Sequence, residues 1–297
     1  AVVFAFHPPQ GVCMSRVFRW LSHWPLWALH GLGAVLGWVV FLASAAYRRN
    51  LLAHAALAGV SRSDALASVA HAGRMVAELP RLWLGPPVPT RMEGAEHIRA
   101  AQAQGHGILF LTPHLGCFEI TARAYAEQFG TQPGRAMTVL FRPPRQAWLR
   151  EVVQTARQRP GLDTAPTTLA GVKQLVKALR SGAAVGLLPD QVPPMGQGVW
   201  APFFGRVAYT MTLSGRLAQT QRTTVLLAWG ERLPWGRGFV VHVLPLPQAL
   251  PADDPVAAST TVNQAMEQLV LAHPAQYLWG YNRYKTPRDV THKELAA

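Results

Sequence analysis

Two short apolar runs constrain the fold of this chain more than any other feature. Residues 107–111 and 183–188 contain no polar side chain. A strand that is apolar on both faces is typical of a parallel sheet covered by helices on both sides. We therefore expect a layered α/β domain with a mostly buried central sheet.

The rest of the chain alternates in the same way. Helices are expected at residues 61–79, 94–104, 118–129, 145–157, 167–180, 209–221 and 255–272. Further strands are expected at residues 136–141, 224–229 and 239–244. Alternation of this kind indicates one α/β domain, which we place at residues 51–297.

The N-terminal region has a different pattern. Residues 24–47 form a stretch of 24 residues without a formal charge, and arginines flank it on both sides. A helix of this length measures about 36 Å, enough to cross a bilayer. We expect residues 14–50 to form an N-terminal membrane helix with a single span, and a helix that lies in the interface or packs on the protein is the alternative. Residues 1–13 contain no Lys or Arg and form an extension of uncertain status.

The glycines of this apolar stretch mimic a dinucleotide-binding fingerprint. Gly31, Gly33 and Gly37 have a suggestive spacing, but no strand precedes them and they lie inside the expected helix. Small residues at such intervals are typical of close contact between helices. We expect them to serve packing and predict no nucleotide site here.

The net charge of the chain limits the classes of binding partner that we expect. The chain has 28 Lys and Arg against 15 Asp and Glu, which gives a net charge of +13. A field of this sign favours phospholipid headgroups, phosphorylated glycolipids, nucleic acid or an acidic carrier protein. Aromatic residues are not interleaved with the basic ones as in nucleic-acid-binding modules, so no nucleic-acid partner is expected. The two cysteines, Cys13 and Cys117, cannot build a disulfide framework, which fits a reducing compartment.

A histidine and a carboxylate lie five residues apart where the first apolar strand ends. With His114 in the loop and Glu119 in the first turn of the next helix, the carboxylate can reach the imidazole. A carboxylate on one ring nitrogen fixes the tautomer and leaves the other nitrogen to take a proton from a hydroxyl. Chance pairs of this kind are common, and the spacing does not suit a metal pair. The arrangement suits acyl transfer to an alcohol.

Two more strand ends carry polar side chains. Arg142 follows the strand at 136–141, and Asp190 follows the strand at 183–188. Because ligands of open α/β sheets gather beyond the carboxyl ends of the strands, His114, Arg142 and Asp190 are expected to converge.

Several motifs together resemble those of a known family. They are His114 with Glu119, residues 139–143 (VLFRP), residues 189–191 (PDQ), residues 198–205 (GVWAPFFG), residues 273–279 (HPAQYLW) and residues 283–285 (RYK). In this order, over residues 14–285, they resemble the lipid A biosynthesis late acyltransferases (lauroyl and myristoyl acyltransferases) of the glycerolipid acyltransferase superfamily.

The resemblance implies transfer of a fatty acyl group from acyl carrier protein to a hydroxyl of a lipid A precursor, an anionic glycolipid. The reaction is expected at the cytoplasmic face of the bacterial inner membrane, with no metal or other cofactor. The resemblance makes His114 the general base and Glu119 its orienting acid. It assigns substrate-binding roles to Arg142, Arg157, Asp190 and Gln191.

The chain departs from the family pattern near the histidine. Cys117 and Phe118 stand where the family usually has Asn and Trp, and Arg145 stands where Asn is commoner. A thiol three residues from His114 raises the alternative of a covalent acyl-enzyme. We favour a small buried residue at Cys117 that helps the helix to pack.

Other functions remain open at this level. The same chemistry would serve another membrane glycolipid or a lysophospholipid, with acyl-CoA as donor. A non-catalytic, membrane-anchored protein that binds anionic lipid is an alternative of another class. Lys173, Lys177 and Arg180 are spaced to share a helix face, which is either simply solvated or docks an acidic carrier protein.

Overall fold

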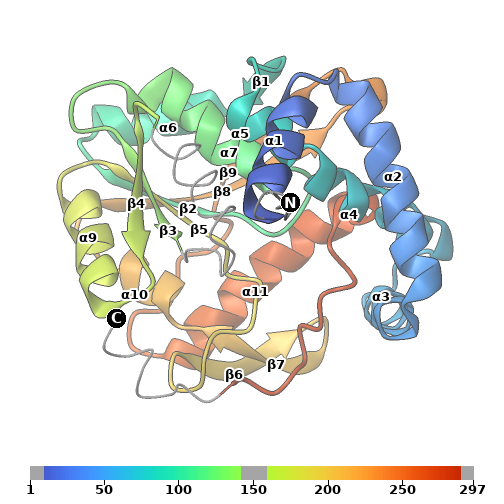
Figure 1. The fold of residues 1–297 in the computed structure, drawn as a ribbon. Helices are drawn as coiled ribbons and strands as arrows, with labels where there is room; N and C mark the ends of the chain where they lie inside the picture. The colour runs from blue at the N-terminus through green and yellow to red at the C-terminus, as the bar shows by residue number, and fades with distance from the viewer. Residues whose placement is uncertain (1–9, 142–158, 289–297) are drawn as a thin grey trace, which may run out of the picture.

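A seven-stranded sheet forms the centre of the molecule (Figure 1). The computed structural model describes residues 10–141 and 159–288, with side chains from residue 15 onward. The strand order is β1-β9-β8-β2-β5-β3-β4, and every neighbouring pair is parallel except β8 and β9. The strands are β1 (Thr90–Glu93), β2 (Gly107–Leu111), β3 (Met137–Phe141), β4 (Leu162–Pro166), β5 (Ala184–Leu187), β8 (Thr223–Arg232) and β9 (Phe239–Pro245). The expected α/β fold with a buried sheet is confirmed.

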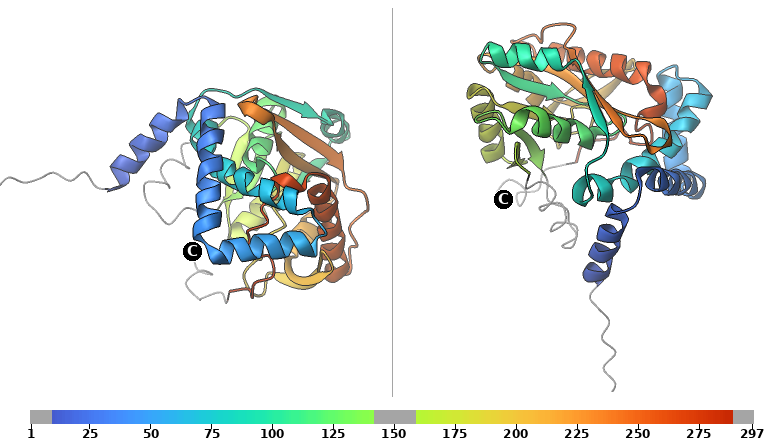
Figure 2. Two further views of the ribbon diagram at one scale, coloured as in Figure 1. Left: turned by 90° about the vertical axis from the view of Figure 1, so that its right-hand side faces the viewer. Right: turned by 90° about the horizontal axis from the view of Figure 1, so that it is seen from above.

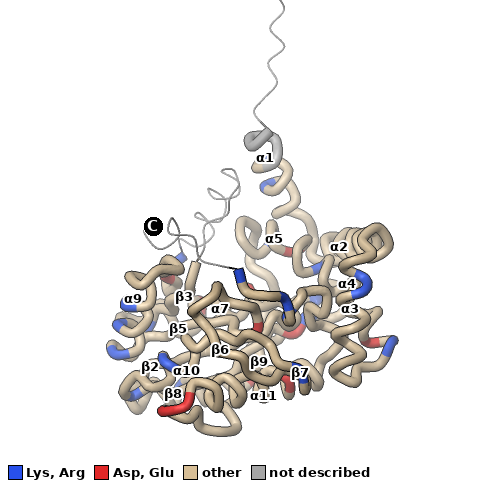
Figure 3. Tube along the Cα trace, turned by 90° about the horizontal axis from the view of Figure 1, so that it is seen from below, with Lys and Arg blue, Asp and Glu red and all other residues tan. Residues whose placement is uncertain are grey.

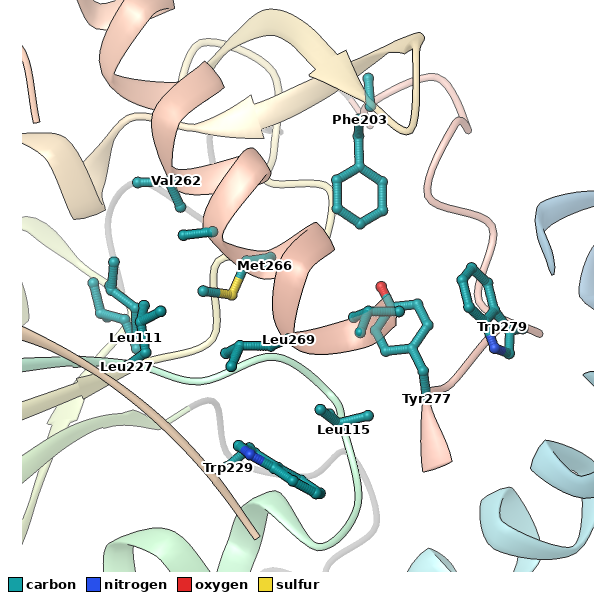
Figure 4. Close-up of a cluster of buried hydrophobic side chains, with 14 of the residues drawn as sticks. Leu111, Leu115, Phe203, Leu227, Trp229, Val262, Met266, Leu269, Tyr277 and Trp279 are labelled. Carbon is teal, nitrogen blue, oxygen red and sulfur yellow. The ribbon is translucent and has the colours of Figure 1, made fainter. Parts of the chain in front are cut away.

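Helices cover both faces of the sheet, as the apolar strands require. Helices α6 (Ala95–Ala103) and α7 (Phe118–Tyr125) pack on one face. Helices α9 (Leu169–Arg180), α10 (Leu213–Ala218) and α11 (Pro255–Ala272) pack on the other. Successive residues of β2 enter opposite cores: Ile108 and Phe110 face α7, while Leu109 and Leu111 face α11. Figure 4 shows the α11 side, where Leu111 and Leu227 meet Val262 and Met266.

Most expected elements of the domain are confirmed, and local caps explain several boundaries. Helix α4 (Arg62–Ala77) begins after Ser61, whose hydroxyl accepts a hydrogen bond from the backbone N–H of Asp64. Thr168 caps α9 in the same way through the N–H of Gly171. An N-cap hydroxyl satisfies one of the otherwise unpaired amides of the first helical turn. The helix expected at 145–157 lies outside the described residues.

The helix expected at residues 209–221 is wrong in its first part. Residues Arg206–Met211 form β7, which pairs with β6 (Gly198–Phe203) in a separate antiparallel hairpin, and only Leu213–Ala218 is helical. Tyr209 and Thr210 favour a strand, and the hairpin is held from α11, where the Asn263 side chain donates to the Pro202 carbonyl. Strands β1 and β4 are short edge strands with polar residues, and the sequence pattern did not predict them.

The apolar N-terminal stretch is two helices instead of one. Helix α2 (Leu26–Ala43) has 18 residues, and α3 (Ala45–Leu57) turns away from it at Ser44. The backbone of Ser44 is extended, and its hydroxyl caps α3 by accepting from the N–H of Tyr47. By length and composition, α2 is the one helix in residues 10–141 and 159–288 that could cross a membrane. Helix α1 (Gln10–Ser22) precedes it and projects from the body (Figure 2).

Candidate active site

His114 lies in the connection between β2 and α7, which we call the His114 loop (residues 112–117). The loop is fixed on two sides by backbone hydrogen bonds. The N–H of Gly116 donates to the Gln276 carbonyl at 2.9 Å, and the N–H of Cys117 donates to the Gly230 carbonyl at 2.7 Å. Leu115 forms a β-bridge with Tyr277, and both side chains are buried (Figure 4). The imidazole therefore projects from a rigid backbone.

Gly116 is required by the shape of this loop. Its φ is +59°, a left-handed conformation, and a Cβ atom there would lie 2.0 Å from the Gly230 carbonyl oxygen. A side chain would strain the backbone and push the loop off β8. Glycine thus allows the chain to turn sharply after His114 and to start α7 at Phe118.

Asp190 holds the imidazole in place. Nδ1 of His114 lies 2.7 Å from Oδ1 of Asp190, and the backbone N–H of His114 donates to Oδ2 at 2.8 Å. Both oxygens of one carboxylate thereby fix one residue. The contact arises because β2 and β5 are neighbours in the sheet, so that the segments beyond their carboxyl ends meet.

The Asp190 carboxylate is ionised although it is 2% exposed. Burial works against ionisation, but the charge of His114, the hydrogen bonds that it donates and the charge of Arg283 hold the pKa of Asp190 below its ordinary value. An ionised acceptor requires a proton on Nδ1, so Nε2 of a neutral ring carries the lone pair. The geometry thus provides an oriented base.

The second ring nitrogen of His114 is the open one. It lies 3.0 Å from the side-chain amide nitrogen of Gln191, which donates to the Nε2 lone pair. The Phe118 ring lies beside the imidazole, with 4.9 Å between ring centroids. Gln191 is only partly buried, so Nε2 faces a position that a substrate hydroxyl can take.

Glu119 lies in the first turn of α7, as the sequence predicted, and lines the same cavity as His114. Its Oε2 accepts a hydrogen bond from the Trp83 indole at 3.2 Å. Sequence reasoning expected Glu119 to bind one ring nitrogen of His114, and in the structure the carboxylate on Nδ1 is that of Asp190. Sequence reasoning had placed Asp190 at the site as a substrate-binding residue. Arg142 and Arg157 lie outside the described residues.

A cavity opens in front of Nε2. It has a volume of about 410 Å³ and lies between the sheet and helices α6 and α7. Its polar lining residues include Glu119 and the contacting pair His114 and Gln191, and we call this part of the cavity its polar end. The other walls are mainly apolar, and they include Ile98, Phe110, Tyr125, Met137, Val139 and Val241. A cavity with one polar end and apolar walls suits a long aliphatic chain whose reactive end is polar.

Cys117 is placed poorly for a nucleophile. It is 1% exposed and is not among the residues that line the cavity. Burial, followed by the charge of Glu78, raises the pKa of its thiol well above the ordinary value. Since the thiolate is the reactive form, the structure supports the packing role that we favoured.

A second ionic cluster, formed by Glu78 and Arg232, holds the backbone of the His114 loop, and the sequence did not predict it. Arg232 donates to both oxygens of Glu78, at 2.6 Å and 2.8 Å, and to the Gly116 carbonyl at 3.1 Å. Glu78 is also bonded to Nε2 of His30 on α2, at 2.9 Å. Burial opposes ionisation of Glu78, but Arg232 overcomes it and lowers the pKa of Glu78 to about 2.

Comparison with known proteins gives the family. Residues 18–286 match the model of the bacterial lipid A biosynthesis acyltransferase family. Over 202 residues the chain is 31% identical to the lipid A biosynthesis lauroyltransferase of Escherichia coli K12, covering 66% of this chain and 62% of that protein. It is 28% identical over 220 residues to the lipid A biosynthesis palmitoleoyltransferase of the same organism, covering 72% and 69%.

A third relative is more distant. The lipid A biosynthesis acyltransferase of Haemophilus influenzae is 24% identical over 196 residues, with 66% of this chain and 59% of that protein covered. The family match extends from α1 across the His114 loop, the cavity and the Asp190 turn to the C-terminal segment that holds the loop. The chain belongs to the bacterial lipid A biosynthesis acyltransferase family.

Proposed function

We propose that this protein transfers a fatty acyl group from acyl carrier protein to a hydroxyl of a lipid A precursor, with His114 as the general base. The observation that carries the proposal is the geometry of His114, with Nδ1 held by a buried carboxylate and Nε2 at the polar end of an apolar cavity. This arrangement suits proton removal from a hydroxyl beside a bound acyl chain.

The reaction runs by direct attack. The acceptor hydroxyl displaces the Gln191 amide from Nε2 and gives its proton to that nitrogen while its oxygen attacks the thioester carbonyl. The tetrahedral intermediate collapses to the ester, and the leaving thiolate takes the proton from the imidazolium. No covalent acyl-enzyme forms, which agrees with the buried, protonated Cys117.

Asp190 acts as a positioning residue in this scheme. Its carboxylate keeps the proton on Nδ1 before the reaction and stabilises the imidazolium while it exists. Because the backbone N–H of His114 binds the same carboxylate, the ring and its loop are oriented together. Glu119 adds negative charge at the polar end of the cavity and supports the imidazolium electrostatically.

The apolar walls would receive the acyl chain. Phe110, Val139 and Val241 come from three strands of the sheet, and Tyr125 of α7 faces them across the cavity. Burying an alkyl chain there contributes about 0.8 kcal/mol per CH₂ group. Arg142 and Arg157 are proposed to bind anionic groups of the substrates, on the basis of the family pattern.

The family and the names of the relatives support a lipid A precursor as acceptor. Such an acceptor places the enzyme at the inner membrane, and we propose that the domain lies on the cytoplasmic face. Another glycolipid or a lysophospholipid, and acyl-CoA as donor, would fit the same base and cavity. A purely lipid-binding role is disfavoured because it has no use for the oriented Nε2.

The test is transfer of labelled acyl groups from acyl carrier protein to a tetra-acylated lipid A precursor. His114→Ala is expected to lower the rate by about 10²–10⁴. His97→Ala is the matched control, because His97 lies on α6 and does not line the cavity. If folded wild-type protein is inactive with this donor and this acceptor, acyl-CoA and other acceptor lipids would be tested next. A His114→Ala variant within a few-fold of wild type would refute the general base.

A further inference from the structure

Helix α2 is apolar around its whole circumference although only one face is covered. The covered face consists of Leu26, Leu29, His30, Gly33, Gly37 and Phe41. The opposite face is open to solvent: Trp27 is 65% exposed, Val35 is 62% exposed and Leu42 is 70% exposed. No Lys, Arg, Asp or Glu lies on this helix (Figure 3). A helix at a water-exposed surface carries polar residues on its outer face. The outer face of α2 is therefore expected to contact a membrane or another protein.

The covered face of α2 is docked firmly on the domain. Gly33 and Gly37 meet Gly73 of α4 so closely that a Cβ atom on Gly73 would lie 1.9 Å from the Gly33 carbonyl oxygen. His30 reaches the buried Glu78, which is held in turn by Arg232 of β8. Helix α2 therefore keeps its orientation relative to the sheet.

Exposed tryptophans surround the N-terminal end of α2. Trp235, in the turn between β8 and β9, is 88% exposed and has a φ of +60°, which is unfavourable for a bulky residue. The next residue, Gly236, packs on the backbone of Trp27, so this turn lies against the start of α2. Trp20 on α1 is 59% exposed. Indole rings in such positions are typical of the boundary between lipid and water.

The charge of this region favours anionic lipid as the covering. Residues 10–90 contain seven arginines and two acidic residues, Asp64 and Glu78. Glu78 is buried and paired, so it does not offset the basic field at the surface. Arginine side chains beside an apolar face are attracted to the phosphates of anionic phospholipids. A second copy of this chain would bring like charges together.

We propose that α2 lies parallel to the membrane plane, with its outward face in one leaflet and Trp235 as a second anchor, and does not cross the bilayer. This inference deepens the proposed function and rests on it for the choice of an anionic bacterial membrane. A docked α2 that crossed the bilayer would draw α4, with Arg62 and Arg74, into the hydrocarbon layer, where charges are strongly disfavoured. The length of α2 permits a span, since 18 residues measure about 27 Å, so it is this docking that disfavours crossing.

The C-terminal end of α2 supports the same orientation. The Arg48 guanidinium folds back onto this end and donates to the carbonyls of Phe41 and Leu42, at 2.9 Å and 3.0 Å. Helix α3 continues from there along the domain. The end of α2 is thus tied to a charged group and to a helix that returns to the protein, as expected for a helix that stays at one surface.

Depth measurements on vesicles of phosphatidylcholine and phosphatidylglycerol test the orientation. In a Cys13→Ser background, Leu32→Cys, Val35→Cys, Val39→Cys and Leu42→Cys would each carry an environment-sensitive fluorophore. Quenching by lipids brominated at different depths is expected to place all four labels at a similar shallow depth. A central label deep in the bilayer, with the end labels near opposite leaflets, would overturn the proposal.

Vesicle flotation of full-length variants provides an independent test. Val35→Glu with Val39→Glu is expected to reduce vesicle binding at least about tenfold, because it places two charges on the apolar face. Trp235→Ala is expected to reduce it several-fold. The matched control is Val256→Glu with Leu271→Glu, two exposed apolar residues of α11, and it should bind as wild type does. Equal binding by Val35→Glu/Val39→Glu and wild type, or a stable dimer that protects the α2 labels without vesicles, would contradict the proposal.

Acyl transfer in detergent micelles separates this inference from the proposed function. The Val35→Glu/Val39→Glu variant should keep transfer to a micellar acceptor, because α2 lies outside the cavity, while losing transfer to an acceptor in vesicles. A second outcome is that the wild type transfers no acyl group in either micelles or vesicles while the four fluorophores on α2 still lie at one shallow depth. That result would refute the proposed function and leave the membrane orientation of α2 supported.

Discussion

Two buried carboxylates hold the His114 loop, one directly and one through an arginine, and one of the two clusters faces a cavity. Asp190 holds His114, and Glu78 holds Arg232, whose guanidinium binds the carbonyl of Gly116 in the same loop. In the Glu78 cluster all three guanidinium nitrogens have protein partners. In the Asp190 cluster Nε2 of His114 faces a cavity. The comparison indicates that a closed cluster stabilises the loop, whereas an open nitrogen makes the other cluster a site for chemistry.

The substitution Asp190→Asn tests the open cluster and has the largest expected effect. An amide at this position offers Nδ1 no ionised acceptor and favours the wrong tautomer, so kcat should fall by about 10²–10⁴. KM for the carrier substrate should change far less, because Asp190 does not contact the acyl chain in this scheme. The pH profile of kcat and a thermal melt distinguish this role from a structural one. Unchanged kcat and pH profile in the variant would remove Asp190 from the mechanism.

The substitution Glu78→Leu tests the closed cluster. It leaves the Arg232 guanidinium buried without its counter-charge, and breaking such a pair destabilises a protein by about 3–5 kcal/mol. Urea unfolding would measure the loss. The double variant Glu78→Leu with Arg232→Met removes both charges and should recover much of the stability. If Glu78→Leu unfolds like wild type, the cluster does not hold the loop.

The third prediction is that the Glu78–Arg232 cluster makes the stability of the protein depend on pH. The titrating group is His71, whose Nδ1 lies 3.1 Å from Nη1 of Arg232. Burial, followed by the charges of Arg232 and Arg74, lowers the pKa of His71 to about 3. An unfolded chain has a histidine pKa of about 6.5, so it binds more protons than the folded state between these values. The contribution of neutral, buried His71 to the free energy of unfolding is therefore complete above about pH 6.5 and is lost as the pH falls toward 3. At pH 5 the loss is about 2 kcal/mol.

The measurement is the urea midpoint at pH 7 and pH 5 for wild type and for His71→Asn. The variant should show a smaller change in stability between the two pH values. His97→Asn serves as control, because His97 is on α6, away from this cluster. An identical pH dependence in wild type and His71→Asn would mean that another group titrates.

The sequence predicted the fold well where a local pattern determined the structure. Helix α11 occupies the expected residues, because Asp254 caps it and Pro255 begins it. The site was predicted in outline, since strand ends at neighbouring positions brought His114 and Asp190 together. The positioning role of Asp190 was not predicted, because the pairing of β2 with β5 decides which carboxylate reaches Nδ1. Glu78 and Arg232 are 154 residues apart, and no local signal joins them.

The smallest predicted effect concerns the cavity in front of the open nitrogen. Ala122 on α7 lines it, so Ala122→Leu should shorten the space for the acyl chain. Each methylene that no longer fits costs about 0.8 kcal/mol, or about fourfold in kcat/KM. Competition between carrier proteins loaded with chains of different length would show the preference moving to shorter chains. Ala178→Leu on α9, which lies outside this cavity, should leave the preference unchanged. If both variants keep the wild-type preference, the acyl chain does not occupy this cavity, and the open nitrogen serves a substrate that approaches from elsewhere.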